Sequence, residues 1–212
     1  MGFKITVITI EVITMDRRKR KTRKAIFDAC VSLTKEVDFQ QITVNEIVKT
    51  ADINRGTFYL HFEDKFDMMN SFENEMIEKI ENLLVKNLPD EQSNQQFLES
   101  RYTTIIEILK CYTNNKELLQ LLLRSSNNTS FQLKLREKLK VVMTEQVLPK
   151  ISKSELNVPI DLFVILFTSA SLSLAEYAYK TDTAINSEEL ANFLIKLMMQ
   201  GPAKTLGLIS NE

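Results

Sequence analysis

The sequence is poor in residues that bend or interrupt a chain, with only four glycines and four prolines among 212 residues. It also has no tryptophan, one histidine and two cysteines. Scarce glycine and proline, beside a hydrophobic content of 44%, argue against disorder and favour an all-helical protein with a sizeable core. The two cysteines, Cys30 and Cys111, lie far apart within apolar helical patterns, which indicates two core residues in a reducing compartment. A redox switch is the less favoured alternative.

Motifs for catalysis are also missing. The chain has no phosphate-binding loop, no nucleophile motif and no cluster of metal-ligating residues. His61 has no second histidine, cysteine pair or carboxylate cluster at ligand spacing, so a metal site or a catalytic base is disfavoured. We therefore predict a protein that is not an enzyme and that uses no cofactor or metal.

Residues 1–14 differ from the rest because their β-branched residues alternate as in a strand. Glu11 interrupts the apolar run and no small-residue cleavage site follows, so the segment makes a poor signal peptide. Met15 stands directly before a basic run, and we expect residues 1–14 to be an extension from an upstream start codon, with a native edge strand as the alternative. No later segment has about 18 uninterrupted apolar residues, which predicts no membrane span and a cytoplasmic protein.

The net charge of −1 hides a strong asymmetry. Residues 16–65 contain 11 Lys and Arg against 8 Asp and Glu, whereas residues 66–212 contain 15 against 19. Seven of the eight residues from Arg17 to Lys24 are basic. Such a run repels itself unless an anionic partner lies nearby, which points to nucleic acid.

Apolar periodicity and end signals predict the helices. A first helix covers about 16–36, and Thr43 with Glu46 forms a capping box for a short second helix. Asp52 marks a tight turn and Asn54 caps a third helix of about seven residues. A long helix starts near Asp64. The remaining helices are expected at about 93–112, 115–125, 128–149, 160–180 and 187–200.

Two short helices joined by a tight turn after a basic segment are typical of a helix-turn-helix. Gly56 lies where a helix begins, and glycine costs about 1 kcal/mol there relative to alanine. We expect its missing side chain to let the recognition helix approach DNA. Phe58 and Phe62 are assigned to the core. The predicted DNA contacts are Arg17, Arg18, Thr43, Asn54, Arg55, Gly56, Thr57, Tyr59, His61 and Lys65.

The run "TVNEIVKTADINRGTFYLHFEDKFDMM" resembles the DNA-binding signature of the TetR family of bacterial transcriptional regulators. The resemblance covers about residues 17–70. Asp52 stands where that family often has glycine and Asn54 where it often has serine, and both replacements suit the turn and the cap. The resemblance implies a DNA-binding domain over 15–65, and a domain over 66–212 that binds a ligand and dimerises.

The same resemblance implies a homodimer that binds a palindromic operator and responds to an unknown small molecule. Small side chains crowd 160–180 and an apolar helix follows, so residues 160–200 are the expected dimer interface. The candidate walls of a ligand pocket are Phe66, Met69, Phe72, Met76, Phe97, Tyr102, Ile105, Leu122, Phe131 and Phe167. A repressor is the preferred reading. The alternative is a repressor or an activator whose C-terminal domain binds a protein. An exposed apolar patch would favour that alternative, and a large apolar cavity would favour a small ligand.

Overall fold

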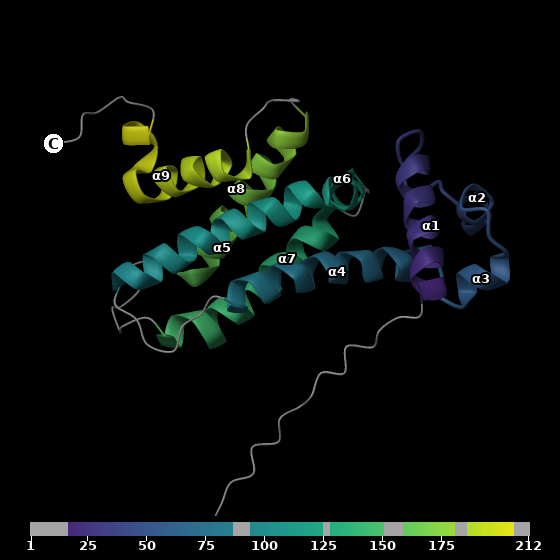
Figure 1. The fold of residues 1–212 in the computed structure, drawn as a ribbon, viewed down its shortest axis with the longest axis horizontal. Helices are drawn as coiled ribbons and strands as arrows, with labels where there is room; N and C mark the ends of the chain where they lie inside the picture. Colours follow the sequence, from purple (N-terminus) through teal and green to yellow (C-terminus); the bar gives the residue numbers. More distant parts are fainter. Residues whose placement is uncertain (1–16, 87–93, 125–127, 151–158, 181–185, 206–212) are drawn as a thin grey trace, which may run out of the picture.

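The computed structural model describes residues 17–86, 94–124, 128–150, 159–180 and 186–205. Within these ranges the chain forms nine α-helices and no strand (Figure 1). They are α1 (Arg17–Leu33), α2 (Val44–Thr50), α3 (Arg55–Tyr59), α4 (Lys65–Lys86), α5 (Asn94–Asn114), α6 (Lys116–Arg124), α7 (Asn128–Val142), α8 (Ile160–Lys180) and α9 (Ser187–Thr205). The all-α prediction is confirmed. Residues 1–14 lie outside the described residues.

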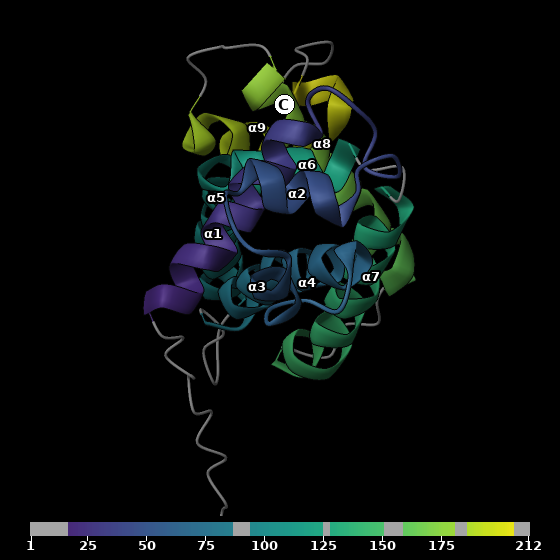
Figure 2. The ribbon, with the colours of Figure 1, turned by 90° about the vertical axis from the view of Figure 1, so that its right-hand side faces the viewer.

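Helices α1, α2 and α3 gather at one end of the molecule, and α4 runs from them into the remaining helices (Figure 1). Viewed from that end, α2 and α3 lie in front (Figure 2). Helix α4 packs against α5, α6 and α7, while α7 packs on α8 and α5 on α9. Helix α6 also contacts α1. The N-terminal helices are therefore joined to the rest through both α4 and α6.

One continuous core connects these layers, from Ile26 in α1 to Ala191 in α9. Phe58 and Phe62 are buried in it, as predicted, whereas Tyr59 between them is exposed. Burial of this apolar surface is the main stabilising contribution, at about 25 cal/mol per Å².

Several helix ends follow the predicted local signals. The capping box of Thr43 and Glu46 is present, and Asp52 adopts the left-handed turn conformation with φ of 51°. The carbonyl of Pro159 accepts the amide of Leu162 at the start of α8. The glycine at 201 has φ of 75° and interrupts α9. Local chemistry thus fixes where these elements begin and end.

Three predicted helices are shorter than expected, and α3 has five residues instead of about seven. Helix α1 ends at Leu33 rather than near residue 36. Helix α7 ends at Val142, after which Met143–Val147 forms a π-helical turn and Leu148–Lys150 a 3-10 turn. The latter contains the proline at position 149, which has no amide hydrogen and cannot continue an α-helix.

Both cysteines are free thiols in the described structure. Burial raises the pKa of Cys30 to about 12, and it also raises the pKa of the half-buried Cys111. Neither thiol is therefore activated as a nucleophile.

Candidate nucleic-acid interface and C-terminal cavity

Helices α2 and α3 are held at a fixed angle by their turn. The amide of Ala51 donates to the carbonyl of Ile47 (2.8 Å), and the amide of Ile53 donates to that of Val48 (3.0 Å). Ile47 and Val48 in α2 and Phe58 in α3 point into the core. This turn and its three anchors leave the opposite face of α3 in solvent.

The outer face of α3 presents Asn54, Arg55, Gly56 and Tyr59, which are all exposed, while Thr57 is half-buried. The Arg55 guanidinium lies 5.6 Å from the Tyr59 ring centroid, and its Nη2 donates to the Tyr59 hydroxyl (3.2 Å). Asn54 occupies the N-cap position, but its side chain makes no capping bond. The side-chain amide of Asn54 therefore remains at the surface, next to Arg55 in the chain.

Leu60 directly follows α3 and is 84% exposed, the largest fraction among the exposed large hydrophobic residues. This exposure could not be predicted from the sequence, because a leucine in a helical pattern usually belongs to the core. Leu60 therefore adds an exposed apolar side chain directly after Tyr59.

Gly56 has no neighbour that requires a glycine. A Cβ built at this position meets no atom within 4 Å, and its φ is not positive. Neither close packing within the chain nor backbone conformation explains the residue. What remains is open space in front of α3, where a bound partner can approach the backbone.

Thr43 has a different role from the predicted phosphate contact. Its amide and its hydroxyl both donate to the Glu46 carboxylate (2.7 and 2.8 Å), and the hydroxyl accepts the amide of Glu46 (3.2 Å). These hydrogen bonds from Thr43 lower the pKa of Glu46. The capping box thus occupies the hydroxyl and keeps a carboxylate beside it, so we remove Thr43 from the DNA contacts.

Lys65 is also occupied within the protein. Its ammonium donates to the carbonyl oxygens of Phe39 (3.1 Å), Gln40 (2.8 Å) and Ile42 (2.8 Å). It further lies 5.1 Å from the centroid of the Phe66 ring. Because an ammonium has three N–H donors, none is left for a phosphate. The predicted phosphate contact of Lys65 is therefore corrected to a structural role: it closes the loop before α2.

Replacing Lys65 by alanine should destabilise the protein, because three carbonyl oxygens lose a charged donor. We expect the free energy of unfolding to fall by about 1–3 kcal/mol, measured by urea denaturation. Lys35→Ala, which removes an exposed lysine after α1, is the control and should change stability by less than about 0.5 kcal/mol. Equal stability of the two variants would contradict the assigned role.

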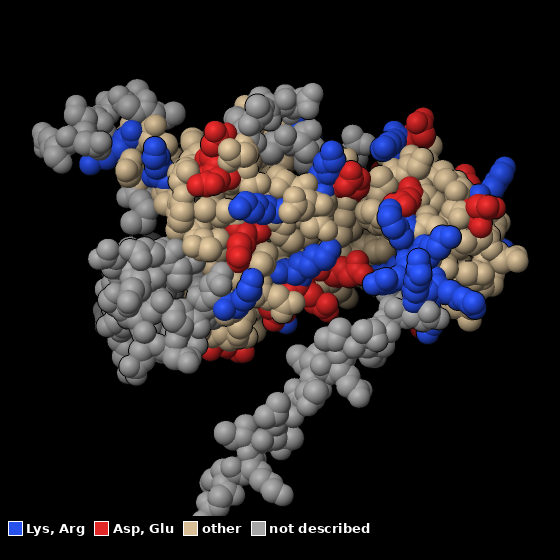
Figure 3. All heavy atoms as spheres, in the orientation of Figure 1, with Lys and Arg blue, Asp and Glu red and all other residues tan. Residues whose placement is uncertain are grey.

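Basic residues gather at the start of α1, seen as the blue cluster in Figure 3. Arg17 and Arg18 are both exposed there. Lys24 belongs instead to an ion pair with Asp28 (2.7 Å). The outer turns of α1 therefore supply a positive surface at the same end of the molecule as α3 (Figure 1).

Arg23 belongs to the same basic run but points inward, which its sequence context did not reveal. Its guanidinium lies 5.0 Å from the Phe62 ring centroid and 5.3 Å from that of Phe72. It donates to Ser71 Oγ (2.8 Å) and to the Glu75 carboxylate (2.9 Å). Arg23 thus fastens α1 to one turn of α4.

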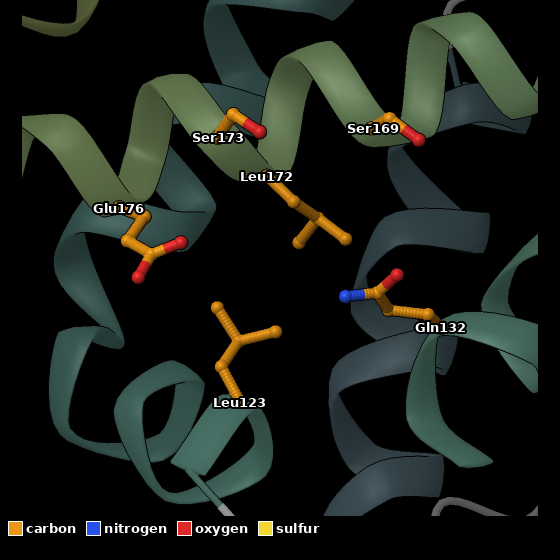
Figure 4. Close-up of a pocket in the computed structure, with 6 residues that line it drawn as sticks. All are labelled: Leu123, Gln132, Ser169, Leu172, Ser173 and Glu176. Atoms are coloured by element: carbon orange, nitrogen blue, oxygen red, sulfur yellow. The ribbon is translucent and has the colours of Figure 1, made fainter. Parts of the chain in front are cut away.

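A cavity of about 120 Å³ lies among α6, α7 and α8 (Figure 4). It is lined by Leu123, Gln132, Ser169, Leu172, Ser173 and Glu176. We call it the α6–α8 cavity. In the described part of the chain, no group of three or more His, Cys, Asp or Glu residues is placed to hold a metal ion.

Comparison with known proteins identifies both parts of the chain. Residues 26–71 match the family described as bacterial regulatory proteins, tetR family, and residues 99–200 match a transcriptional regulator C-terminal region. The chain belongs to the TetR family. The outer face of α3 is therefore that of a helix-turn-helix in a TetR-family transcriptional regulator.

Two curated relatives come from Bacillus subtilis (strain 168). An uncharacterised HTH-type transcriptional regulator, YxbF, is 39% identical over 51 residues, which is 24% of this chain and 13% of that protein. A fatty acid metabolism regulator protein is 27% identical over 127 residues, 60% of this chain and 63% of that protein. In each case the match spans less than two thirds of the relative.

Solved structures of other TetR-family proteins share the fold. A regulator from Syntrophomonas wolfei has a TM-score of 0.67 at 17% identity, covering 91% of this chain and 99% of that one. FadR from Bacillus subtilis, in complex with stearoyl-CoA, has a TM-score of 0.61 at 21% identity, covering 84% and 98%. A TetR regulator from Streptococcus agalactiae has a TM-score of 0.53 at 25% identity, covering 86% and 96%.

Among the ten predicted pocket residues of this TetR-family chain, those whose side chains the structure describes do not line the α6–α8 cavity, and their contact with a ligand stays a prediction. Met69, Met76, Leu122 and Phe131 are buried in the core. Three of the other described residues make ring contacts: Phe66 with Phe39, Phe72 with Phe27 and Phe62, and Phe167 with Phe163. The Tyr102 hydroxyl donates to Asn192. Ile105 packs against the core. The side chain of Phe97 lies outside the described residues. Most of these large apolar residues lie in the core or pack against it, whereas the cavity is lined by two leucines, two serines, a glutamine and a glutamate.

Proposed function

We propose that this protein is a ligand-responsive transcriptional repressor that binds a palindromic operator as a homodimer. The observation that carries the proposal is the exposed face of α3, at the same end of the molecule as the basic start of α1. Dimerisation would place two such faces roughly 34 Å apart, one turn of DNA. A protein of this class works in the cytoplasm.

In this proposal α3 enters the major groove, with Arg55 at base edges and Gly56 closest to the DNA backbone. The complete set of proposed contacts is Arg17, Arg18, Asn54, Arg55, Gly56, Thr57, Tyr59 and His61. The Arg55 guanidinium is already held against Tyr59 by a hydrogen bond to its hydroxyl, which lowers the conformational entropy lost on binding.

Selection of bound sequences from a random DNA pool tests this function with the purified full chain. We expect the selection to enrich a palindromic site. The affinity of the protein for that site should fall steeply as the salt concentration rises. If a folded dimer enriches no sequence, the proposed operator binding is wrong.

The proposed dimer surface is the outer face of α8. Leu162, Ile165, Leu166 and Tyr177 are exposed on this helix, and Phe193 is exposed on α9. The segment Ile160–Tyr177 is apolar and long enough to cross a membrane, judged by its length and composition alone, and 28% of it is buried. A helix in the interface of a dimer can be equally long and apolar, and a second copy packed on α8 would account for the exposed apolar residues.

Leu166→Ala should weaken this dimer. Leu166 is 70% exposed, and losing part of its apolar surface should cost about 1–2 kcal/mol per protomer. Sedimentation equilibrium measures the shift toward monomer. Leu133→Ala, an exposed leucine on α7, is the control. A wild-type protein that is monomeric at every concentration would instead favour a partner protein on this face.

His61 should make operator binding depend on pH. Burial is the largest cause that lowers the pKa of His61, and the positive charges of Arg23 and Lys19 lower it further. The free protein thus holds a neutral imidazole at pH 7, and folding stability falls as pH drops from 6.5 toward the lowered pKa. A DNA phosphate beside His61 would raise this pKa, so operator binding takes up a proton.

We therefore expect operator affinity to rise as pH falls from 7.5 to 6, by up to about tenfold for each unit of pKa increase. His61 is the chain's only histidine, and His61→Gln should flatten the profile. Fluorescence anisotropy with labelled operator measures both. The same pH slope in the two proteins would remove His61 from the interface.

Helix α4 is the proposed link between ligand and DNA. Glu73 lies between the two α4 residues that Arg23 binds, and its carboxylate is paired with Lys134 of α7 (2.6 Å). A ligand that shifts α7 would therefore pull on α4 and on α1 through Arg23. Typical coupling of this kind is 1–3 kcal/mol, or about 5- to 150-fold in operator affinity.

The relatives offer one ligand to test first. FadR from Bacillus subtilis is described in complex with stearoyl-CoA, and the matching curated relative is a fatty acid metabolism regulator. A long-chain acyl-CoA is accordingly the effector class that similarity favours for this chain.

A further inference from the structure

Leu60 presents an apolar side chain on the helix that is proposed to enter the major groove. It is 84% exposed and directly follows α3, the second helix of the helix-turn-helix, which lies in front when the molecule is viewed from that end (Figure 2). A single leucine on a protein surface needs no special explanation by itself. What sets Leu60 apart is where its side chain points.

The backbone at Leu60 fixes the direction of this side chain. Leu60 is the C-cap of α3, its dihedral angles are helical (φ −73°, ψ −15°), and its amide donates to the Gly56 carbonyl (3.2 Å). Successive residues of an α-helix are turned by about 100°. Leu60 therefore points about 200° away from the buried Phe58 two positions earlier. Its side chain lies opposite the core, on the same face as Gly56.

The space in front of this face is open. A Cβ built on Gly56 meets no atom within 4 Å, so the Leu60 side chain stays clear of the glycine. At a rise of about 1.5 Å per residue, Leu60 lies about 6 Å farther along α3, a distance of about two base-pair steps. DNA that touches the backbone at Gly56 would therefore also meet the leucine within about two base pairs.

The chemistry of leucine selects one feature of the major groove. A leucine side chain has no hydrogen-bond donor or acceptor, so it cannot bind a phosphate or pair with the polar groups on a base edge. The apolar group that base pairs present in this groove is the C5-methyl of thymine. Contact between the two removes apolar surface from water on both sides, which is favourable.

Arg55 is placed to read a different base pair. Its Nη2 donates to the Tyr59 hydroxyl (3.2 Å), and a guanidinium is suited to the acceptors of guanine. Leu60 lies five residues later and is turned about 140° from Arg55 around the helix. The face of α3 thus offers a polar reader and an apolar reader at two separate positions.

We propose that Leu60 reads a thymine in each operator half-site through apolar contact with its C5-methyl group. The inference rests on the proposed function and adds a specificity-determining residue to it. It implies that one thymine in each half-site contributes to affinity through its methyl group alone.

The test uses the full-length protein and the operator enriched from the random DNA pool. Each thymine of a half-site is replaced in turn by deoxyuridine, together with its symmetry mate, which removes the methyl group and keeps every hydrogen-bonding group of the base pair. Fluorescence anisotropy gives the affinities of wild type, Leu60→Ala and Leu133→Ala for each operator and for random-sequence DNA. Leu133 is 49% exposed on α7 and is the control for shortening a surface leucine.

We expect one thymine position at which deoxyuridine weakens wild-type binding about 15-fold, because each buried methyl group contributes a factor of about four and the operator contains two. Leu60→Ala should weaken binding to the thymine operator to a similar extent. Deoxyuridine at that position should then cost this variant little more, since both changes remove the same contact.

A contact with a base methyl group leaves other properties of the protein unchanged. Leu60→Ala should keep the wild-type affinity for random-sequence DNA and the wild-type salt dependence, because it loses no phosphate contact. It should also keep the midpoint of urea denaturation, since the side chain is exposed. Leu133→Ala should bind every DNA like wild type.

The inference is overturned if no deoxyuridine substitution weakens binding, or if the enriched half-sites contain no thymine. It is also overturned if Leu60→Ala weakens binding to operator and random DNA alike, or if deoxyuridine costs wild type and Leu60→Ala the same factor. Failure of the proposed function looks different, because the pool then yields no enriched sequence. An enriched operator without a methyl effect refutes only the role of Leu60.

Discussion

Gly56→Ala should make the protein more stable and a poorer DNA binder at the same time. Alanine favours a helix over glycine by up to about 1 kcal/mol, and a Cβ at this position meets nothing within 4 Å. The added methyl instead occupies the space in which α3 approaches DNA. We expect operator affinity to fall by about 1–3 kcal/mol, more for Gly56→Leu than for Gly56→Ala.

Gly201→Ala is the matched control, because it makes the same chemical change where the backbone needs glycine. Gly201 has φ of 75° and ψ of 167°, a conformation nearly restricted to glycine. This variant should lose about 1–3 kcal/mol of stability while folded protein keeps its operator affinity. Urea denaturation and fluorescence anisotropy together separate the two glycines. Wild-type operator affinity in Gly56→Leu would show that α3 does not approach DNA at this point.

Local signals in the sequence predicted the helices well because each signal acts within a few residues. A capping box, a turn aspartate and a proline before a helix all involve contacts within one turn. The tight turn at Asp52 and the cap at Thr43 therefore appear in the structure as expected. The burial of Phe58 and Phe62, opposite the exposed Tyr59, follows from the helical period alone.

The roles of individual charged residues were harder to predict, because their partners are distant in sequence. Lys65 binds carbonyl oxygens 23 to 26 residues away, and Arg23 reaches Glu75 52 residues away. Nothing in a basic run distinguishes Arg23, which points inward, from Arg17, which is exposed. Only the packing of α1 on α4 makes that distinction.

The α6–α8 cavity is hard to predict from the sequence for a related reason. Large apolar residues are the usual walls of a ligand pocket, yet those of this chain fill the core, since burying them stabilises the fold most. The cavity appears where two helices carry serines and a glutamine instead, at Ser169, Ser173 and Gln132. The sequence pattern predicts the small residues of α8 at the dimer interface, but spacing alone does not tell which face of that helix turns outward.

The pair of Glu73 and Lys134 should produce the largest loss of stability. Glu73 is 3% exposed in its side chain, and Lys134 Nζ lies 2.6 Å from its carboxylate and 2.9 Å from Asn70 Oδ1. Lys134→Met leaves the buried carboxylate without its cation and with a long hydrogen bond from Ser130 Oγ (3.5 Å), and a buried charge that loses its partner typically costs about 3–5 kcal/mol. Urea denaturation should show this loss, whereas Lys138→Met removes a more exposed pair with Glu81 and should cost less than about 1 kcal/mol.

Removing both charges should restore most of the stability. In a Glu73→Met, Lys134→Met variant no carboxylate is left unpaired, and apolar replacements of buried pairs are often neutral or stabilising. The double variant should therefore unfold within about 1 kcal/mol of wild type and still bind its operator. Its operator affinity should respond less to the effector, because two methionines lack the directed hydrogen bonds that fix α7 against α4. A stable double variant with the full response would show that the pair only holds the fold together, and that the signal reaches α1 through α6.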